Sequence, residues 1–173
     1  LLLPFRGKTV LETTVETVLE IPFREVVVVT GHDRAAVEAL LESHPVRVVH
    51  NSRYPEGMGA SLRVGVAAAE GSAGVMILPG DMPLIRRETL LALCRAFAGA
   101  TLSAPIVVPV HGGRRGNPVV FSPEYREALL GISGDRGAKA ILRAHPRAVV
   151  EVEVDDPGIF IDVDTPEDYH ALE

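Results

Sequence analysis

The sequence lacks several features that define other classes of protein. Cys94 is its single cysteine among 173 residues, so no disulfide can form within the chain. No apolar run reaches the ~18 residues that a membrane-spanning helix needs. The formal net charge is −6, and no basic cluster is interleaved with aromatic residues, which argues against a nucleic-acid partner. We therefore expect a cytoplasmic protein that binds neither membranes nor nucleic acid.

Common catalytic motifs are lacking as well. The 6 histidines show no His-x-His or His-x-x-x-His spacing, which argues against a zinc site. No Gly-x-Ser-x-Gly elbow marks a nucleophilic serine. Cys94 shares an apolar helical face with Leu90, Leu93 and Phe97, so we expect it in the core rather than as a nucleophile. Apolar residues make up 47% and charged residues 23%, which is typical of one globular domain spanning residues 1–173.

Strand-like and helix-like segments alternate along the chain. Residues 25–30 form a β-branched run typical of a strand buried on both faces, and residues 75–78 form a second buried apolar run. Residues 46–49 predict a further strand, and segments with helical spacing separate the three. This alternation predicts an α/β domain of Rossmann-like type, three layers thick, with a mostly parallel sheet. Residues 105–110 and 117–121 lie too close together for a helical crossover. They predict a small hairpin excursion from the main sheet.

Three short patterns predict where helices begin. Thr9-Val10-Leu11-Glu12 has the form of a capping box, in which Thr9 and Glu12 bond each other's backbone N–H groups. Ser122-Pro123 places a capping residue before a proline at the first helical position. Thr165 is predicted to cap the last helix in the same way.

An aspartate follows the buried strand at residues 75–78. Gly80 allows a tight turn there, Asp81 stands at its tip, and Pro83 stiffens the far side. Ligands gather beyond the carboxyl ends of strands in open α/β sheets. A carboxylate held there suits Mg²⁺, which keeps several waters and takes one or two protein carboxylates. The alternative is that Asp81 caps the following helix or bonds turn amides.

A second acidic cluster ends another apolar stretch near the C-terminus. Asp162 and Asp164 are spaced i, i+2, so on extended chain both face the same side. If one of them lies beside Asp81, the pair forms a divalent-metal site. The alternative is that both merely border the cap at Thr165 and bond local amides.

Other segments carry weaker signals. Gly57 and Ser61 lie in a run of small residues before a helix, where backbone amides can approach a base or phosphate closely; a plain loop-to-helix entry is the simpler alternative. Arg114 and Arg115 sit in a glycine-rich turn, and arginine forks suit phosphate. Arg136 is placed at a predicted helix start. Solvated surface is the alternative for these arginines.

Six segments, taken in order, resemble the MobA-like nucleotidyltransferases, and within them the CTP:molybdopterin cytidylyltransferases. They are LLLPFRGKTVLE, NSRYPEGMGASLRVG, PGDMPLI, GRRGNPVVF, GDRGAK and DVDTPEDY, and they cover essentially the whole chain. The resemblance implies a nucleotidyltransferase fold and transfer of a cytidylyl group from CTP to the terminal phosphate of molybdopterin, releasing pyrophosphate. It also implies transient contact with a molybdenum oxidoreductase that receives the product.

The resemblance also assigns roles to particular residues. It implies that Asp81 and Asp162 are catalytic and bind Mg²⁺, with Asp164 as a further metal ligand. It implies nucleotide contacts in two places, and acceptor contacts in the segments RRGNP and GDRGA. The nucleotide residues are Gly57, Ser61, Gly80 and Asp81; the acceptor residues are Arg115, Asn117 and Arg136.

The sequence departs from the family pattern in two places. The family has a Leu-Ala-Ala-Gly-x-Ser-x-Arg-Met-Gly loop, which cradles the triphosphate, just before the segment that matches LLLPF. The chain opens at Leu1 without that loop or a methionine, and we expect the loop to be encoded upstream. Asn117 stands where the family has a histidine, which affects the acceptor contact there.

Two alternatives remain open at this point. The same chemistry could use GTP, or a sugar or polyol phosphate as acceptor. A non-catalytic chaperone that delivers the molybdenum cofactor to an oxidoreductase is the second alternative. Pyrophosphate release distinguishes the first from the second.

Overall fold

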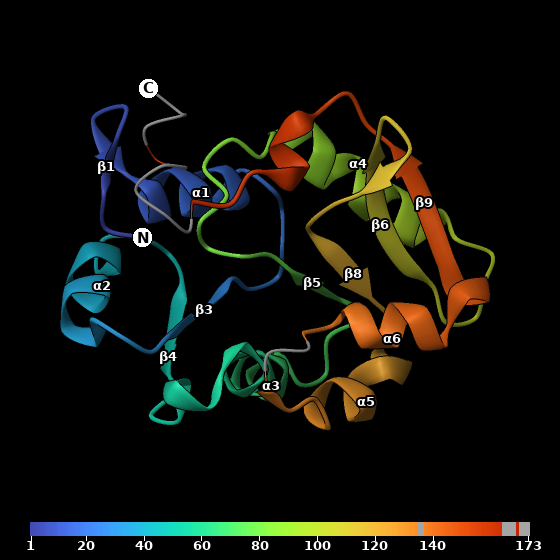
Figure 1. Cartoon of the computed structure of the whole chain (residues 1–173), viewed down its shortest axis with the longest axis horizontal. Coiled ribbons are helices and arrows are strands. Elements are labelled where there is room, and N and C mark those ends of the chain that lie inside the picture. Colours follow the sequence, from blue (N-terminus) through green and yellow to red (C-terminus); the bar gives the residue numbers. More distant parts are fainter. Residues whose placement is uncertain (135–136, 164–168, 170–173) are drawn as a thin grey trace.

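A computed structural model describes residues 1–134, 137–163 and 169. Strands and helices alternate through most of this range, as the sequence predicts (Figure 1). The strands are β1 (Pro4–Phe5), β2 (Lys8–Thr9), β3 (Val27–Thr30), β4 (Arg47–His50), β5 (Val75–Ile77), β6 (Ile106–His111), β7 (Arg114–Arg115), β8 (Val119–Phe121) and β9 (Val149–Glu153). The helices are α1 (Val10–Leu19), α2 (Arg34–Leu41), α3 (Met58–Ala68), α4 (Arg87–Gly99), α5 (Arg126–Leu130) and α6 (Lys139–Ala144). Short 3-10 turns are η1 (Tyr54–Glu56), η2 (Pro123–Tyr125), η4 (Pro146–Ala148) and η5 (Pro157–Phe160).

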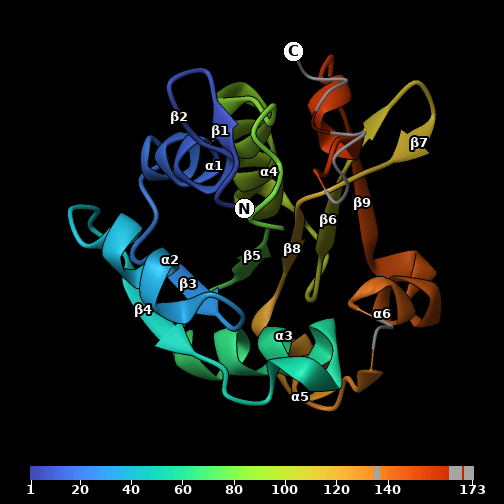
Figure 2. The same cartoon turned by 60° about the vertical axis from the view of Figure 1, so that its left-hand side comes forward.

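The main strands form two groups, which Figure 2 shows apart from each other. β3 and β4 pair in parallel, with Val27 opposite Arg47 and Thr30 opposite His50. The larger sheet has the order β5-β8-β6-β7, and β9 pairs with β6 in parallel. The predicted α/β class is confirmed. The sheet is mixed, because β8 enters antiparallel between β5 and β6.

The predicted hairpin excursion is present. β6 pairs antiparallel with β8, with Ile106 opposite Phe121 and Val107 opposite Val120. The turn between them carries β7, which pairs with the end of β6 at Val110 and His111. The parallel partner β9 then covers the other edge of β6. The excursion is therefore built into the larger sheet rather than attached to its rim.

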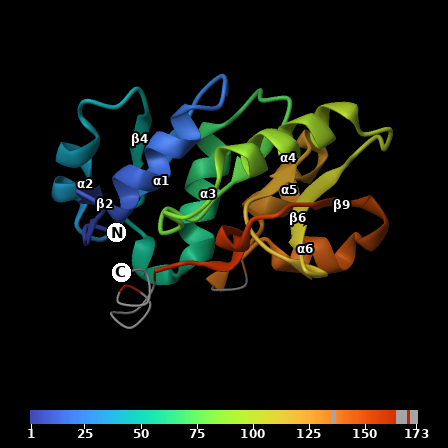
Figure 3. The same ribbon diagram turned by 90° about the horizontal axis from the view of Figure 1, so that it is seen from above.

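Alternating side chains of β6 and β8 build two core layers. Ile106, Val108 and Phe121 pack with α3, α5 and α6, in a cluster that includes Val66 and Leu129. The intervening side chains of the same strands face α4, where Val107 and Val120 pack with Leu93. Figure 3 shows α4 on one side of β6 and α6 on the other. This is the three-layer arrangement that the strand pattern predicts.

The β3–β4 pair has its own covering. Val28 and Val48 pack with Leu11, Val37 and Leu41 from α1 and α2. On the side of α3, Gly65 approaches the pair so closely that an added Cβ would lie 3.1 Å from a methyl of Val29. Helices thus cover both faces of this pair.

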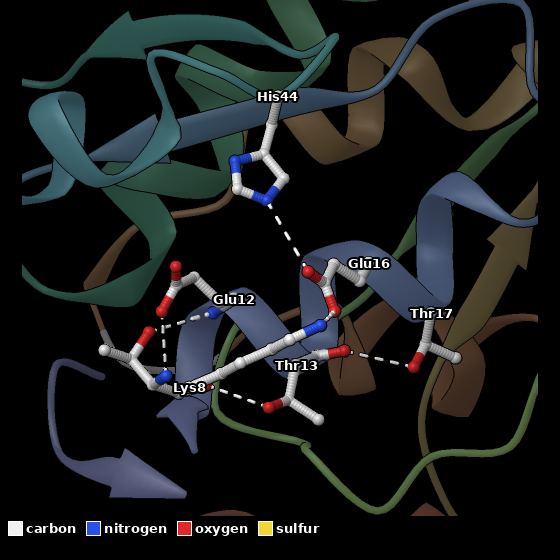
Figure 4. A network of polar contacts seen from close by, with 7 residues as sticks. Lys8, Glu12, Thr13, Glu16, Thr17 and His44 are labelled. Carbon is white, nitrogen blue, oxygen red and sulfur yellow. Dashed lines mark hydrogen bonds and ion pairs between the residues drawn. The ribbon is translucent and has the colours of Figure 1, made fainter. Parts of the chain in front are cut away.

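The predicted capping box at α1 is confirmed. Thr9 Oγ1 accepts from the backbone N–H of Glu12 at 3.1 Å, and the Glu12 carboxylate accepts from the Thr9 N–H at 2.8 Å. Figure 4 shows Glu12 near the ion pair of Lys8 with Glu16; the Glu16 carboxylate also lies 4.0 Å from His44 Nε2. The prediction for Ser122 is wrong in one respect: η2 begins there, but the Ser122 side chain makes no capping hydrogen bond. Thr165 lies outside the described residues.

The length and hydropathy of the helices show whether any of them could span a membrane. Within residues 1–134, 137–163 and 169, no helix is long and apolar enough to cross a bilayer.

Candidate active site

The loop after β5 carries Asp81 to the edge of the larger sheet. Pro79 and Gly80 turn the chain directly after the strand, and an added Cβ on Gly80 would lie 3.2 Å from Leu11 of α1. Met82 and Ile85, each at most 3% exposed, then fix the loop in an apolar cluster with Leu90 and Ile159. Because apolar contacts hold the chain on both sides, the position of Asp81 is set by the fold.

A backbone hydrogen bond joins this loop to the second acidic segment. The N–H of Val163 donates to the carbonyl of Asp81 at 3.0 Å. Val163 is buried, at 8% exposure, whereas the preceding residue, Asp162, is exposed to solvent. Figure 1 shows the chain after η5 running beside the loop that follows β5. The structure thus brings Asp162 next to Asp81 along the backbone, while Asp164 lies outside the described residues.

Asp81 and Asp162 offer hard carboxylate oxygens of the kind that Mg²⁺ and similar cations prefer. Asp81 is half-buried, with its Oδ1 buried, whereas Asp162 is exposed to solvent. Among the described residues, no group of three or more His, Cys, Asp or Glu could hold a metal by itself. A pair that leaves the remaining positions to water and substrate fits Mg²⁺ better than a closed protein cage does.

A buried carboxylate holds the acidic segment in place. Asp156 is 1% exposed, and its Oδ2 accepts from the Arg86 N–H at 3.0 Å and from the Thr89 hydroxyl at 2.6 Å. Its Oδ1 accepts from the Gly158 N–H at 2.9 Å. The Arg86 guanidinium also donates to the Asp155 carbonyl at 2.7 Å. These bonds tie the start of α4 to Asp156 at the start of η5, and Asp156 lies six residues before Asp162 in the chain.

The predicted nucleotide segment lies at the start of α3. Gly57 has φ of 99°, a conformation that favours glycine, and it leads the chain from η1 into the helix. Ser61 lies one turn further, and its Oγ accepts from Asn51 Nδ2 at 3.0 Å. Asn51 follows β4, is 3% exposed, and also accepts from the Arg53 N–H at 3.0 Å. The asparagine thus fixes both the loop and the first turn of α3.

The predicted acceptor residues are placed differently from one another. Asn117 donates its backbone N–H to the carbonyl of Ile159 at 2.9 Å, which attaches this segment to η5 and so to the acidic region. Gly116 is required there, because an added Cβ would lie 2.5 Å from the same carbonyl oxygen. Arg115 instead forms an ion pair with Glu151 at 2.6 Å on the surface, with its side chain 47% exposed. Arg136 lies outside the described residues.

The family of the chain follows from its match to a known domain. The model of the MobA-like NTP transferase domain matches residues 1–149. The chain belongs to the MobA-like NTP transferase family.

Proteins similar to this chain are named for different activities. The nicotine blue oxidoreductase of Paenarthrobacter nicotinovorans is 34% identical, over 99% of this chain and 86% of its own. The molybdenum cofactor cytidylyltransferase of Escherichia coli K12 is 23% identical, over 98% and 84%. Rv0371C of Mycobacterium tuberculosis H37Rv, solved in complex with manganese, superposes with a TM-score of 0.85 at 28% identity, over 99% and 89%. The first two of these relatives are named for different reactions, an oxidation–reduction and a cytidylyl transfer.

Two residues of this MobA-like domain escaped the sequence analysis. Asp156 stands in Asp-Asp-Pro-Gly, a turn signal that could have suggested a side-chain bond to the Gly158 amide. Its bonds to Arg86 and Thr89 span 70 and 67 residues, and no local pattern indicates them. Asn51 follows a predicted strand, as Asp81 does, and its place at a strand end was the available signal.

Proposed function

We propose that this MobA-like nucleotidyltransferase transfers a cytidylyl group from CTP to the terminal phosphate of molybdopterin and releases pyrophosphate. The observation that carries the proposal is the hydrogen bond from Val163 to Asp81, which joins the two acidic segments of the chain. The choice of CTP and molybdopterin is supported by the six sequence segments that resemble the cytidylyltransferases and by the cytidylyltransferase relative. A nucleotidyltransferase of this family with another substrate would use the same acidic pair.

Asp81 and Asp162 are the residues that would hold Mg²⁺, with Asp164 as a further candidate. When bound, the ion neutralises charge on the nucleotide phosphates as pyrophosphate leaves. Asp81 brings a carboxylate whose position the fold sets through Gly80 and Met82. Asp162 brings an exposed carboxylate from a segment that Asp156 anchors. Together they supply negative charge at the edge of the sheet and leave open positions for phosphate.

The other proposed site residues position the nucleotide and the acceptor. An acceptor phosphate is already a nucleophile, so the chain needs no strong base to activate it. Gly57, Ser61 and Gly80 are proposed to contact the nucleotide, because small residues at these turns let a base or phosphate approach the backbone. On the acceptor side, Arg115 and Arg136 are proposed to contact phosphate, and Asn117 to orient the acceptor beside η5. For Arg115 this requires release from Glu151, a surface pair that contributes little to stability.

Pyrophosphate release measures the proposed reaction. We expect Asp81→Asn or Asp162→Asn to lower the rate with CTP, Mg²⁺ and molybdopterin by roughly 10²–10⁴, because each loses a charged ligand of the ion. Asp155→Asn is the matched control, since Asp155 is an exposed aspartate close to the same segment. Circular dichroism should show all three variants folded. Wild-type rates in both Asp81→Asn and Asp162→Asn would refute the metal role.

Substrate choice needs its own assay. The purified protein of full encoded length is offered each of the four nucleoside triphosphates, with molybdopterin or with sugar and polyol phosphates. We expect pyrophosphate only with CTP and molybdopterin. Preference for GTP, or for a sugar phosphate, would show that the protein catalyses nucleotidyl transfer with a different nucleotide or acceptor. Tight binding of the cofactor without pyrophosphate would support the chaperone alternative.

A second candidate function is a redox reaction, and the identity of 34% to a protein named nicotine blue oxidoreductase favours it. A cysteine-based mechanism has little support. Cys94 on α4 is partly buried against the apolar cluster that contains Leu90, and burial raises the pKa of its thiol. The two candidate functions differ in whether pyrophosphate is released. A redox enzyme changes the absorbance of a dye substrate without releasing pyrophosphate from a nucleotide.

A further inference from the structure

A small cavity lies at the edge of the larger sheet opposite the acidic pair. Its volume is about 110 Å³, and it opens beside the first residue of β5, Val75, whereas Asp81 follows the last. In the sheet register Val75 is paired with Phe121 at the end of β8, and both line the cavity. The apolar wall is made by Val66, Ala69, Val75, Phe121 and Leu129. None of these residues takes part in the proposed reaction.

Two polar groups in this apolar wall have no partner in the described part of the chain. Ser122 is 4% exposed, and its hydroxyl makes no hydrogen bond there, not even the helix cap that the sequence predicts. The buried Nε–H of Arg126, one turn later, is also without an acceptor. Another nitrogen of Arg126 lies 3.7 Å from Glu127, whose side chain is 89% exposed. Buried polar groups in folded proteins almost always have a partner in the protein or in water, so these two donors are available to an acceptor that enters the cavity.

The chemistry of the cavity defines that acceptor. A hydroxyl and a guanidinium N–H both donate, and a carboxylate has two oxygens that accept from both while balancing the arginine charge. The lining is mainly apolar, with Ser72 as a further side-chain hydroxyl, so it suits a hydrocarbon body better than a phosphate, which has more oxygens to satisfy. Since one water occupies about 30 Å³ of liquid, 110 Å³ corresponds to about four water-sized groups, enough for a short hydrocarbon chain whose carboxylate lies at the two donors. We propose that this cavity binds a small aliphatic carboxylate through Ser122 and Arg126.

Isobutyrate is the probe that tests the site, and isobutyramide is its uncharged match in shape. We expect isobutyrate to cause saturable shifts in the ¹H–¹⁵N spectrum at Ser122, Arg126 and the turn at Gly71, with isobutyramide at least about tenfold weaker. Equal affinity for the two compounds would overturn the assignment to a carboxylate. Binding of inorganic phosphate at these residues, without binding of isobutyrate, would overturn it as well.

Three variants locate the binding. Ser122→Ala and Arg126→Gln should each weaken isobutyrate by about tenfold, as expected for a lost charge-assisted hydrogen bond. Ala69→Leu should abolish binding by filling the cavity while both donors remain. Arg143→Gln, at an exposed position on α6, is the charge control and should bind as the wild type does. If Ser122→Ala or Arg126→Gln does not fold, Ala69→Leu decides, and unchanged binding in it would refute the proposal.

Discussion

Asp156 is the residue through which the site depends most on the fold. Its two oxygens accept three hydrogen bonds from Arg86, Thr89 and Gly158 at 1% exposure. We expect Asp156→Asn to lower the free energy of unfolding by about 1–3 kcal/mol, because the amide nitrogen must face at least one of these donors. Urea unfolding measures this change.

The same variant separates positioning from stability. If Asp156 places the acidic segment, Asp156→Asn should also raise the Mg²⁺ concentration needed for half-maximal pyrophosphate release. Asp155→Asn, one residue earlier and exposed, should leave both measurements unchanged. An Asp156→Asn protein with lower stability but an unaltered Mg²⁺ dependence would show that the bonds support the core and not the site.

At the scale of elements, the start of α1 makes the fold sensitive to acid. Hydrogen bonds from the Thr9 backbone and side chain hold the pKa of Glu12 below its ordinary value of 4.5. A carboxyl with a lowered pKa in the folded state contributes stability above its unfolded pKa, and this is lost as pH falls through the folded pKa. We therefore expect unfolding experiments to show a loss of stability below about pH 4.5 that Glu12→Gln reduces.

Two further variants test that explanation. Thr9→Ala should cost about 1 kcal/mol at neutral pH, the usual effect of losing a helix cap, and should also flatten the acid dependence. Glu70→Gln, in the exposed turn after α3, should keep the wild-type pH profile. An unchanged profile in Glu12→Gln would mean that other carboxyl groups cause the loss.

At the scale of the whole molecule, the sequence predicted the features that depend on local pattern. β-branched runs indicated β3, β4 and β5, and the short spacing of β6 and β8 indicated the hairpin. The strand-end rule pointed to Asp81, whereas its nearness to Asp162 was only a condition for a metal site; the bond from Val163 to Asp81 joins the two segments, and the metal role stays a prediction. Asp156 and the Ser122 cavity could not be foreseen, because their neighbours come from distant segments that only the folded chain brings together.

Ligand-linked stability tests the acidic pair in the intact molecule without measuring turnover. A ligand at a hundred times its dissociation constant stabilises a folded protein by about 2.7 kcal/mol, which in a domain of this size raises Tm by roughly 5–10 °C. We expect Mg²⁺ with CTP to produce such a shift in the wild type and in Asp155→Asn. Asp81→Asn should lose most of it, because the nucleotide phosphates then meet a site with one ion ligand fewer. A full shift in Asp81→Asn would place the nucleotide elsewhere on the molecule.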